Sequence, residues 1–258
     1  MSFVINPYRF GGGAPADPVS SPLHYWDLTD LSATAGGGIY DQGSGDWGGL
    51  DAPTSPTVLG AGGPNGQGCL NFTPSASSQY LDTPTTEAWD GAQDTMTVAF
   101  WVYVDSVAVT RNDLVSWTSG VPNYVVGTAI VNAATDHWWM VHYDGSFYQA
   151  KDTAEPYGST GTWYFMVYSY DGTDMKINKG TTGAAPSTDT VATLTQAGIS
   201  YPAGAAEFSI GTSSTLKGAA GLSHDGRMFA VGIWDFALSD TQMDFVWNSG
   251  NGRTFSEL

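Results

Sequence analysis

Charge is scarce in this sequence, because Asp, Glu, Lys and Arg make up 13% of its 258 residues, against roughly 25% in an average soluble protein. Basic residues are the scarcest: eight Lys and Arg stand against 25 Asp and Glu, for a formal net charge of -17. Nucleic acids and anionic membranes are bound mainly through Lys and Arg, so this balance argues against both as partners. Most of the acids are Asp, which favours turns and loop ends, and we expect the charge to lie on loops.

Cysteine and long hydrophobic runs are also missing. The single Cys69 excludes an internal disulfide framework and a cysteine-rich metal site. Its neighbours Leu70 and Phe72 are apolar, so we expect a buried small hydrophobe rather than a reactive thiol. No stretch approaches the roughly 18 apolar residues of a membrane span, and residues 1–30 lack the basic and apolar pattern of an export signal. We therefore expect a soluble, unprocessed chain.

Glycine, proline and aromatic residues are abundant instead. The 33 Gly and 13 Pro argue against a mostly helical protein, while 10 Trp, 13 Tyr and 11 Phe supply the apolar surface of a sizeable core. Beyond residue 20, short aromatic and β-branched runs alternate with clusters of Gly, Pro, Asn, Asp and Ser, which is typical of a β-sandwich. The clearest predicted strands are residues 24–28, 68–72, 95–104, 113–117, 124–131, 137–143, 163–170, 175–178, 207–210 and 227–236.

One short helix is predicted near the C-terminal end. Ser239 and Gln242 fit a capping box, in which the Ser239 hydroxyl accepts from the Gln242 amide and the Gln242 side chain reaches back. Met243 and Val246 then fall on one apolar face, and Gly250 is placed to end the turn.

Alternation within the strands describes both faces of a sheet. In residues 97–104 one face carries Val, Phe, Val and Val, and the other carries Thr, Ala, Trp and Tyr. Residues 137–143 and 163–170 also place large aromatics on both faces. A solvated outer face would be more polar, so we expect this face either to be covered by loops or to line a binding groove.

The segment before residue 21 differs from the rest of the chain. It opens with apolar and aromatic residues, followed by a Gly and Pro hinge at residues 11–15. Such a segment cannot form a core alone, so we predict that residues 1–20 are an extended docking arm and that residues 21–258 form the main domain. The arm is expected to dock on a neighbouring chain or, as the alternative, on its own domain, through Phe3, Val4, Ile5, Pro7, Tyr8, Arg9 and Phe10.

Six short motifs follow one another along residues 21–252. They are Leu-Asn-Phe at 70–72, Tyr-Leu at 80–81, the run at 95–102, the run at 162–167 with Tyr-Asp-Gly at 170–172, Glu-Phe-Ser-Ile-Gly at 207–211, and the run from 229 to Leu-Ser at 238–239. In this order they resemble the concanavalin-A-like, laminin-G-like jelly-roll family. The resemblance implies an all-β sandwich whose first and last strands lie close together. The similarity of residues 25–28 to residues 233–236 is compatible with that pairing.

The resemblance leaves the function open, because this fold serves lectins, adhesion modules, glycosidases and virion proteins. Glycosidases that resemble it carry two nearby glutamates, one acting as nucleophile and one as acid/base. The four Glu here are scattered along the chain. The neighbouring Asp171 and Asp174 are better interpreted as a hairpin turn. We therefore predict a protein that is not an enzyme.

Glycan binding requires aromatic rings flanked by polar groups that fix the sugar hydroxyls. Residues 136–148 contain both, although half of them must point inward and each alone is better interpreted as core. The candidate ligand-binding residues are Asp136, His137, Trp138, Trp139, His142, Tyr143 and Tyr148.

No cofactor is required by any motif, but the resemblance implies calcium as an alternative, because many relatives bind it at loop ends. Asp41, Asp46 and Asp51 cluster in a loop rich in backbone carbonyls. We favour solvated loop acids over a calcium site for these three residues.

By analogy with virion proteins of the family that the chain resembles, the arm and jelly-roll layout implies a structural protein of a tailed-phage virion, namely a capsid decoration, fibre or tail protein assembled in the host cytoplasm. Its expected partners are other virion proteins and further copies of itself, with a host-surface glycan as a candidate ligand. The alternative is a soluble lectin or a glycan-active enzyme of the same fold, and a cellular adhesion module is a third, less favoured one.

Overall fold

The computed structural model describes residues 19, 21–31, 39–45, 47, 49–73, 79–83, 94–106, 111–118, 124–132, 136–143, 147–151, 159–188, 190–195, 206–212 and 223–258. Within these ranges the chain forms strands β1 His24–Trp26, β2 Ile39–Tyr40, β3 Gly49–Thr54, β4 Thr57–Leu59, β5 Cys69–Phe72, β6 Tyr80–Asp82, β7 Met96–Val104, β8 Arg111–Thr118, β9 Tyr124–Asn132, β10 Asp136–Tyr143, β11 Phe147–Lys151, β12 Trp163–Tyr170, β13 Asp174–Thr181, β14 Thr190–Thr195, β15 Glu207–Ile210 and β16 Gly226–Trp234. The helix α1 spans Asp240–Trp247, and 3-10 turns lie at Pro64–Gly66, Pro186–Thr188, Asn248–Gly250 and Phe255–Glu257.

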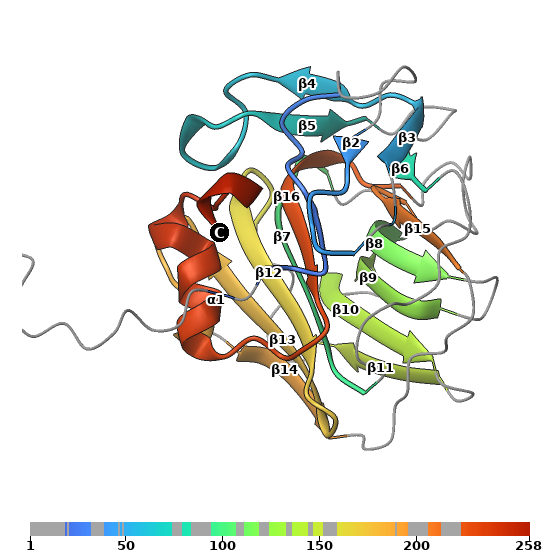
Figure 1. The fold of residues 1–258 in the computed structure, drawn as a ribbon, viewed down its shortest axis with the longest axis vertical. Helices are drawn as coiled ribbons and strands as arrows, with labels where there is room; N and C mark the ends of the chain where they lie inside the picture. Colours follow the sequence, from blue (N-terminus) through green and yellow to red (C-terminus); the bar gives the residue numbers. More distant parts are fainter. Residues whose placement is uncertain are drawn as a thin grey trace, which may run out of the picture.

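The strands form two antiparallel sheets that pack against each other (Figure 1). The first sheet has the order β14-β13-β12-β7-β16-β5-β4, with β1 paired to β16. The second sheet has the order β11-β10-β9-β8-β15-β6-β3-β2. The predicted all-β jelly-roll sandwich with one short C-terminal helix is thereby confirmed.

The inner core lies between the sheets and follows the two-residue period of the strands. In β7, Val98, Phe100, Val102 and Val104 point into it, and each is at most 1% exposed. Strands of the second sheet supply Trp117 and other apolar side chains to the same core. Alternate residues of a strand share a face, so the two-residue period divides the buried residues of β7 between this inner core and the opposite face.

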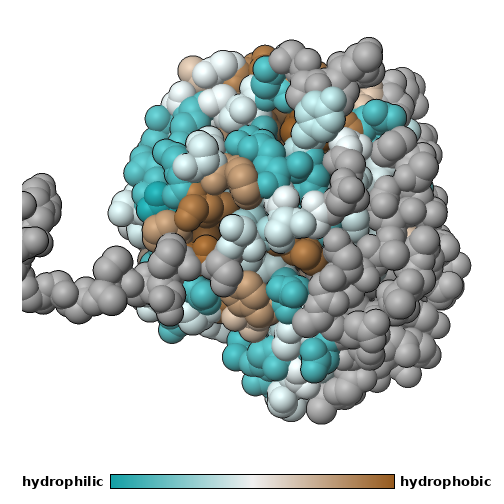
Figure 2. Space-filling view, in the orientation of Figure 1, coloured by the Kyte–Doolittle hydropathy of each residue, from teal (hydrophilic) through white to brown (hydrophobic). Residues whose placement is uncertain are grey.

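A second apolar layer covers the opposite face of the first sheet, and we call it the outer cluster. Trp101 of β7, Phe165 of β12 and Phe229 of β16 point away from the inner core, and each is at most 1% exposed. Met243 and Val246 of α1 pack on them. Of the two alternatives for this aromatic face, cover holds over this part of it, although the covering element is the helix α1 and not a loop. On the face shown in Figure 2, hydrophobic residues form a patch left of centre that is surrounded by hydrophilic and neutral ones.

The first and last strands of the domain are neighbours, as expected. His24 pairs with Ile233, and Trp26 pairs with Val231. The strand β1 also holds the chain's C-terminal segment, because the Tyr25 hydroxyl donates to the Arg253 carbonyl at 2.5 Å. Both ends of the domain therefore meet on the outer face of the first sheet.

The helix begins as predicted but ends earlier. Ser239 is the N-cap, and its reciprocal hydrogen bonds with Gln242 form the capping box. The helix ends at Trp247, and Asn248, with φ 53°, is the C-cap. The prediction that Gly250 ends this turn is wrong, because the side chain of an Asn also tolerates the left-handed conformation.

Candidate functional site

The aromatic segment predicted as a sugar platform lies in β10, where its two tryptophans and one histidine are buried. Trp138 and His142 are 0% exposed, and Trp139 is 4% exposed. Trp138 packs edge-on against Tyr164, with ring centroids 5.6 Å apart. Burial lowers the pKa of His142 to about 3, so this imidazole is neutral. Both tryptophans are therefore core residues, which is the interpretation that the sequence favours for each of them alone.

The physical reason is that both faces of β10 are shielded at this point. Adjacent residues of a strand point to opposite faces, so the burial of two adjacent indoles requires cover on both sides. His137 is half-buried. For Asp136, Tyr143 and Tyr148 the structure describes the backbone, which places Tyr148 opposite His142 in the β10–β11 ladder. A binding role for this segment stays a prediction.

In the loop considered for calcium, Asp41 is not the solvated acid that we favoured, because its side chain is 2% exposed and bonded within the fold. Asp41 Oδ2 lies 2.5 Å from His24 Nδ1, and Asp41 Oδ1 accepts the backbone N–H of Tyr25 and of Gly43, each at 2.9 Å. Asp51 belongs to β3, and Asp46 lies outside the described residues. Within the described ranges, no group of three or more His, Cys, Asp or Glu is placed to hold a metal ion.

Cys69 lies in β5 and is 0% exposed. Its burial raises the pKa of the thiol to about 11, although the nearby Arg227 acts in the opposite direction. The thiol is thus protonated and shielded at neutral pH, which confirms the prediction of a buried small hydrophobe.

The arm residues Phe3, Val4, Ile5, Pro7, Tyr8, Arg9 and Phe10 lie outside the described residues. The first described residue, Val19, is 4% exposed and packs in the outer cluster. The chain therefore enters the domain on the outer face of the first sheet.

A polar cavity of about 350 Å³ opens on this same face, beside the start of α1. Its volume is within the range of sites for small ligands, about 300 to 1,000 Å³. One side is formed by the strands β12, β13 and β14 at one edge of the first sheet, together with the turn between β12 and β13. The other side is formed by the segment that leads into α1 and by the start of this helix. The lining residues are Ser169, Asp171, Lys176, Asn178, Thr190 and Thr193 on the first side, and Ala237, Leu238, Ser239, Asp240 and Met243 on the second.

The turn between β12 and β13 fixes Asp171 at the cavity. Asp171 Oδ1 accepts the backbone N–H of Thr173 at 3.0 Å and of Asp174 at 2.8 Å. Between them Gly172 has φ +92°, a conformation that glycine adopts without strain. The predicted hairpin turn at residues 171–174 is confirmed.

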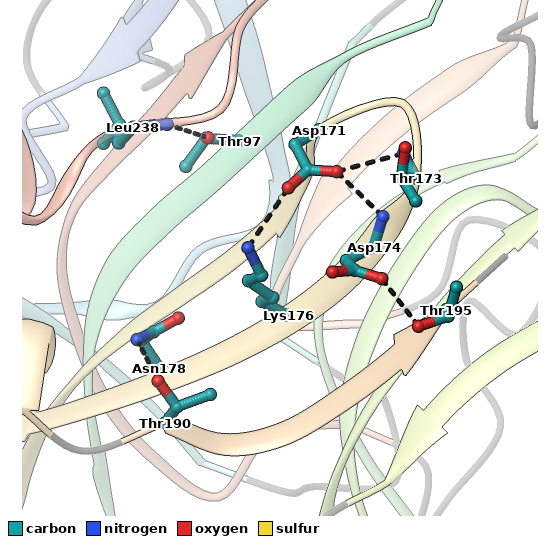
Figure 3. A network of polar contacts seen from close by, with 9 residues as sticks. All are labelled: Thr97, Asp171, Thr173, Asp174, Lys176, Asn178, Thr190, Thr195 and Leu238. Atoms are coloured by element: carbon teal, nitrogen blue, oxygen red, sulfur yellow. Dashed lines mark hydrogen bonds and ion pairs between the residues drawn. The ribbon is translucent and has the colours of Figure 1, made fainter. Parts of the chain in front are cut away.

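Lys176 contributes the one ammonium group of the described lining. Its Nζ lies 3.1 Å from Asp171 Oδ2, and the two side chains are 39% and 35% exposed (Figure 3). Burial by itself would raise the pKa of Asp171, but the backbone hydrogen bond from Asp174 and the contact with Lys176 outweigh it and lower the pKa. Asp171 is therefore ionised and holds the Lys176 ammonium near the cavity opening.

Asn178 presents an oriented amide. Its Nδ2 donates to Thr190 Oγ1 at 2.9 Å and to the Pro186 carbonyl at 3.3 Å. A carbonyl can only accept, so this contact fixes which end of the amide is the nitrogen. The Asn178 Oδ1 points away from Thr190 (Figure 3) and is the acceptor that remains for a ligand.

The opposite wall is anchored to the sheet through Thr97. Thr97 Oγ1 donates to the Phe236 carbonyl at 2.8 Å and accepts the Leu238 N–H at 3.0 Å. The Ser239 capping box then sets the direction of α1. Both walls of the cavity are thus held by hydrogen bonds that involve no ligand.

Sequence reasoning did not single out Lys176, Asn178, Thr190 or Thr193. A usable signal was present in β13, where the polar residues 174, 176 and 178 alternate with the buried Met175 and Ile177. This period places three polar side chains on the outer face of the sheet, where Lys176 lies beside Ser169 of β12 and Thr193 of β14. The meeting of this face with the segment at 237–240 is a tertiary contact that the sequence pattern does not reveal.

None of the helices in the described part of the chain has the length and apolar character that a membrane span requires.

Three solved structures illustrate what the fold is similar to. Domain 4 of a GH43 extracellular arabinanase from Geobacillus stearothermophilus, in complex with arabinotriose, is 15% identical, with a TM-score of 0.60 over 89% of this chain and 98% of that one. A SAP-like pentraxin from Limulus polyphemus is 17% identical, with a TM-score of 0.51 over 68% and 79% of the two chains. The binding domain of botulinum neurotoxin serotype D/C is 11% identical, with a TM-score of 0.58 over 89% of this chain and 52% of that one.

At these identities the likeness shows the fold alone. No curated protein sequence matches the chain significantly. A family model for concanavalin A-like lectins and glucanases matches residues 75–244, which is more than half of the chain. By fold and by sequence, this chain belongs to the concanavalin A-like lectin/glucanases superfamily.

Proposed function

We propose that this chain is a non-catalytic carbohydrate-binding protein of a tailed-phage virion, with the polar cavity as its sugar site. The observation that carries the binding role is the cavity itself, whose described lining combines hydroxyl, amide, carboxylate and ammonium groups. Sugar hydroxyls both donate and accept hydrogen bonds, so a site for them needs both kinds of partner.

The cavity offers such partners in fixed positions. Lys176 Nζ has three N–H donors, and the contact with Asp171 uses one of them. Thr190 Oγ1 accepts from Asn178 and keeps its own hydroxyl hydrogen for a ligand. Because the turn and the β13–β14 contact already hold these groups, a ligand would not have to order them, which favours binding.

The state of Asp171 supports a role without catalysis. A glycosidase needs a carboxyl group with a raised pKa as its general acid and a second carboxylate opposite. The pKa of Asp171 is lowered instead, and both its oxygens already accept hydrogen bonds from the turn and from Lys176. Asp225, whose pKa is raised by burial and by the charge of Asp105, is not among the residues that line the cavity.

The virion role is supported by the arm. An apolar, aromatic opening followed by a Gly and Pro hinge suits a segment that docks on another protein while the domain faces outward. Val19, inside the arm, is buried in the outer cluster. Other virion proteins and further copies of this chain are the partners we propose for the arm, and deletion of residues 1–18, which keeps Val19, should leave a folded domain that no longer joins its particle.

The binding role is tested with a panel of immobilised saccharides. Wild-type protein should bind at least one saccharide, and Thr193→Val should weaken that binding by about tenfold, because one hydrogen-bonding hydroxyl is lost. Thr57→Val is the matched control, since Thr57 is an exposed threonine on β4, the strand at the opposite edge of the same sheet. Equal binding by the two variants would exclude the cavity as the site. Release of reducing ends from any bound saccharide would contradict the non-catalytic role.

A further inference from the structure

The charges that line the polar cavity do not balance. The described lining holds two carboxylates, Asp171 and Asp240, and one ammonium, Lys176. Asp174 follows in the same turn, and its Oδ1 accepts the Thr195 hydroxyl at 2.8 Å (Figure 3). An anion that entered the cavity would therefore meet an excess of negative charge.

The ammonium does not offset this excess for a ligand. Lys176 is paired with Asp171 at 3.1 Å, so its charge is already compensated by a carboxylate that the turn keeps in place. A ligand carboxylate would have to compete with Asp171 for Lys176, whereas a hydroxyl can use the remaining N–H groups and leave the pair intact.

The uncharged part of the lining fits a sugar ring. Leu238 and Met243 border the α1 side of the cavity but are 6% and 4% exposed, so the strand side offers the polar partners, where Asn178 with Thr190 gives an acceptor beside a donor. A pair of neighbouring hydroxyls on a sugar presents the complementary donor and acceptor.

We infer that the polar cavity takes an uncharged saccharide and discriminates against saccharides that carry a carboxylate. This inference rests on the proposed sugar-binding function and names the ligand class for the same cavity. The paired Lys176 acts as a hydrogen-bond donor to hydroxyls, and Asp240 supplies the repulsion that rejects anions.

The test compares two probes on the full chain, arabinotriose as an uncharged saccharide and N-acetylneuraminic acid as an anionic one, within panels of neutral and of anionic oligosaccharides. The strongest neutral ligand should bind at least about tenfold more tightly than any anionic one. Lys176→Met should lower the affinity for the neutral ligand by about tenfold, because a charged hydrogen-bond donor is lost.

A charge variant separates repulsion from shape. Asp240→Asn should lower the ratio of neutral to anionic affinity by about threefold, the effect of one charge at roughly 6 Å in a water-like medium. Asp105→Asn is its matched control, because Asp105 is an exposed acid just after β7. The end of β7 beside it pairs with Trp163, at the opposite end of β12 from Asp171. The control should leave the ratio unchanged.

The outcomes distinguish failure of the proposed saccharide-binding function from failure of the inferred preference for uncharged saccharides. No binding to either panel contradicts the proposed function itself. Equal or tighter binding of anionic saccharides, abolished by Lys176→Met, leaves the proposed function standing and overturns the inference. Neutral binding that is indifferent to both Lys176→Met and Thr193→Val places the sugar elsewhere and overturns the assignment to this cavity.

Discussion

The outer face of the first sheet carries two regions built on the same strands. In β12, Phe165 and Val167 belong to the outer cluster, and Ser169, the next residue on that face, lines the polar cavity. The helix α1 and its following segment cover the first region, whereas only the start of α1 borders the second. One face of one sheet can therefore be core along one part of a strand and a ligand site two residues further on.

The largest expected difference between the outer cluster and the polar cavity is in how much each contributes to the free energy of unfolding. Phe165→Ala should lower the free energy of unfolding by about 3 to 5 kcal/mol, because it leaves a cavity in the outer cluster. Ser169→Ala, two positions along the same face, should change it by less than about 1 kcal/mol. Denaturant unfolding of both variants measures the difference. Similar losses would mean that the two regions contribute to the fold in the same way.

The next effect concerns the segment that covers the outer cluster. Gly250 has φ +84°, and a Cβ there would lie 2.0 Å from the Thr182 carbonyl oxygen. Gly250→Ala should therefore cost about 1 to 3 kcal/mol of stability. Gly183→Ala is the matched control, since nothing lies within 4 Å of its added Cβ. Thermal or denaturant unfolding in which the two variants coincide would show that the cover does not depend on this close approach.

Asp27, under the segment that covers the outer cluster, and Asp171, at the polar cavity, should have opposite effects on how stability depends on pH. Asp27 accepts the Phe255 N–H at 2.9 Å under the covering segment, and burial raises its pKa. Its contribution to stability is present below the unfolded pKa of about 3.9 and is lost as pH rises through the higher folded pKa. The lowered pKa of Asp171 gives a contribution that is present above about pH 3.9 and is lost as pH falls through the lower folded pKa.

Unfolding measured from pH 3 to pH 8 tests this sign. Relative to wild type, Asp27→Asn should gain stability as pH rises, while Asp171→Asn should lose it. Parallel pH profiles for the two variants would contradict the assignment of opposite shifts.

The smallest expected effect is on the ion pair in the cavity. Because Lys176 and Asp171 are 39% and 35% exposed, the pair is screened by solvent, and Lys176→Met should change the free energy of unfolding by less than about 1 kcal/mol. Saccharide binding should fall in the same variant. A large loss of stability would assign the pair to the fold rather than to a ligand.

Most of the fold could be predicted from the sequence because its strands are long and strongly patterned. The predicted strand at 163–170 has the same bounds as β12, and the order of the motifs predicted the family that the family model confirms. The strands that were missed are short or polar, such as β4 at Thr57–Leu59 and β14 at Thr190–Thr195. Their pairing depends on the neighbouring strand more than on their own composition.

The candidate site was harder to predict because aromatic content does not distinguish an exposed platform from a core. Trp138 and Trp139 satisfy the composition of a sugar platform, yet both are buried. The polar cavity instead depends on a turn, on one strand at the sheet edge and on the entry into α1, which are far apart in the sequence. Among its lining residues, the sequence indicated Asp171 as part of a turn and Ser239 and Met243 as part of a helix, and none of them as part of a site.

The pairing of β1 with β16 also bears on how the protein is made. Trp26 lies opposite Val231, about 200 residues later in the chain. At a synthesis rate of roughly 5 to 20 residues per second, the first strand waits roughly 10 to 40 seconds for its partner to leave the ribosome. During that time the buried aromatic residues of β1 have no sheet to join, so a delay in translation near the end of the message would expose them to aggregation and to chaperones.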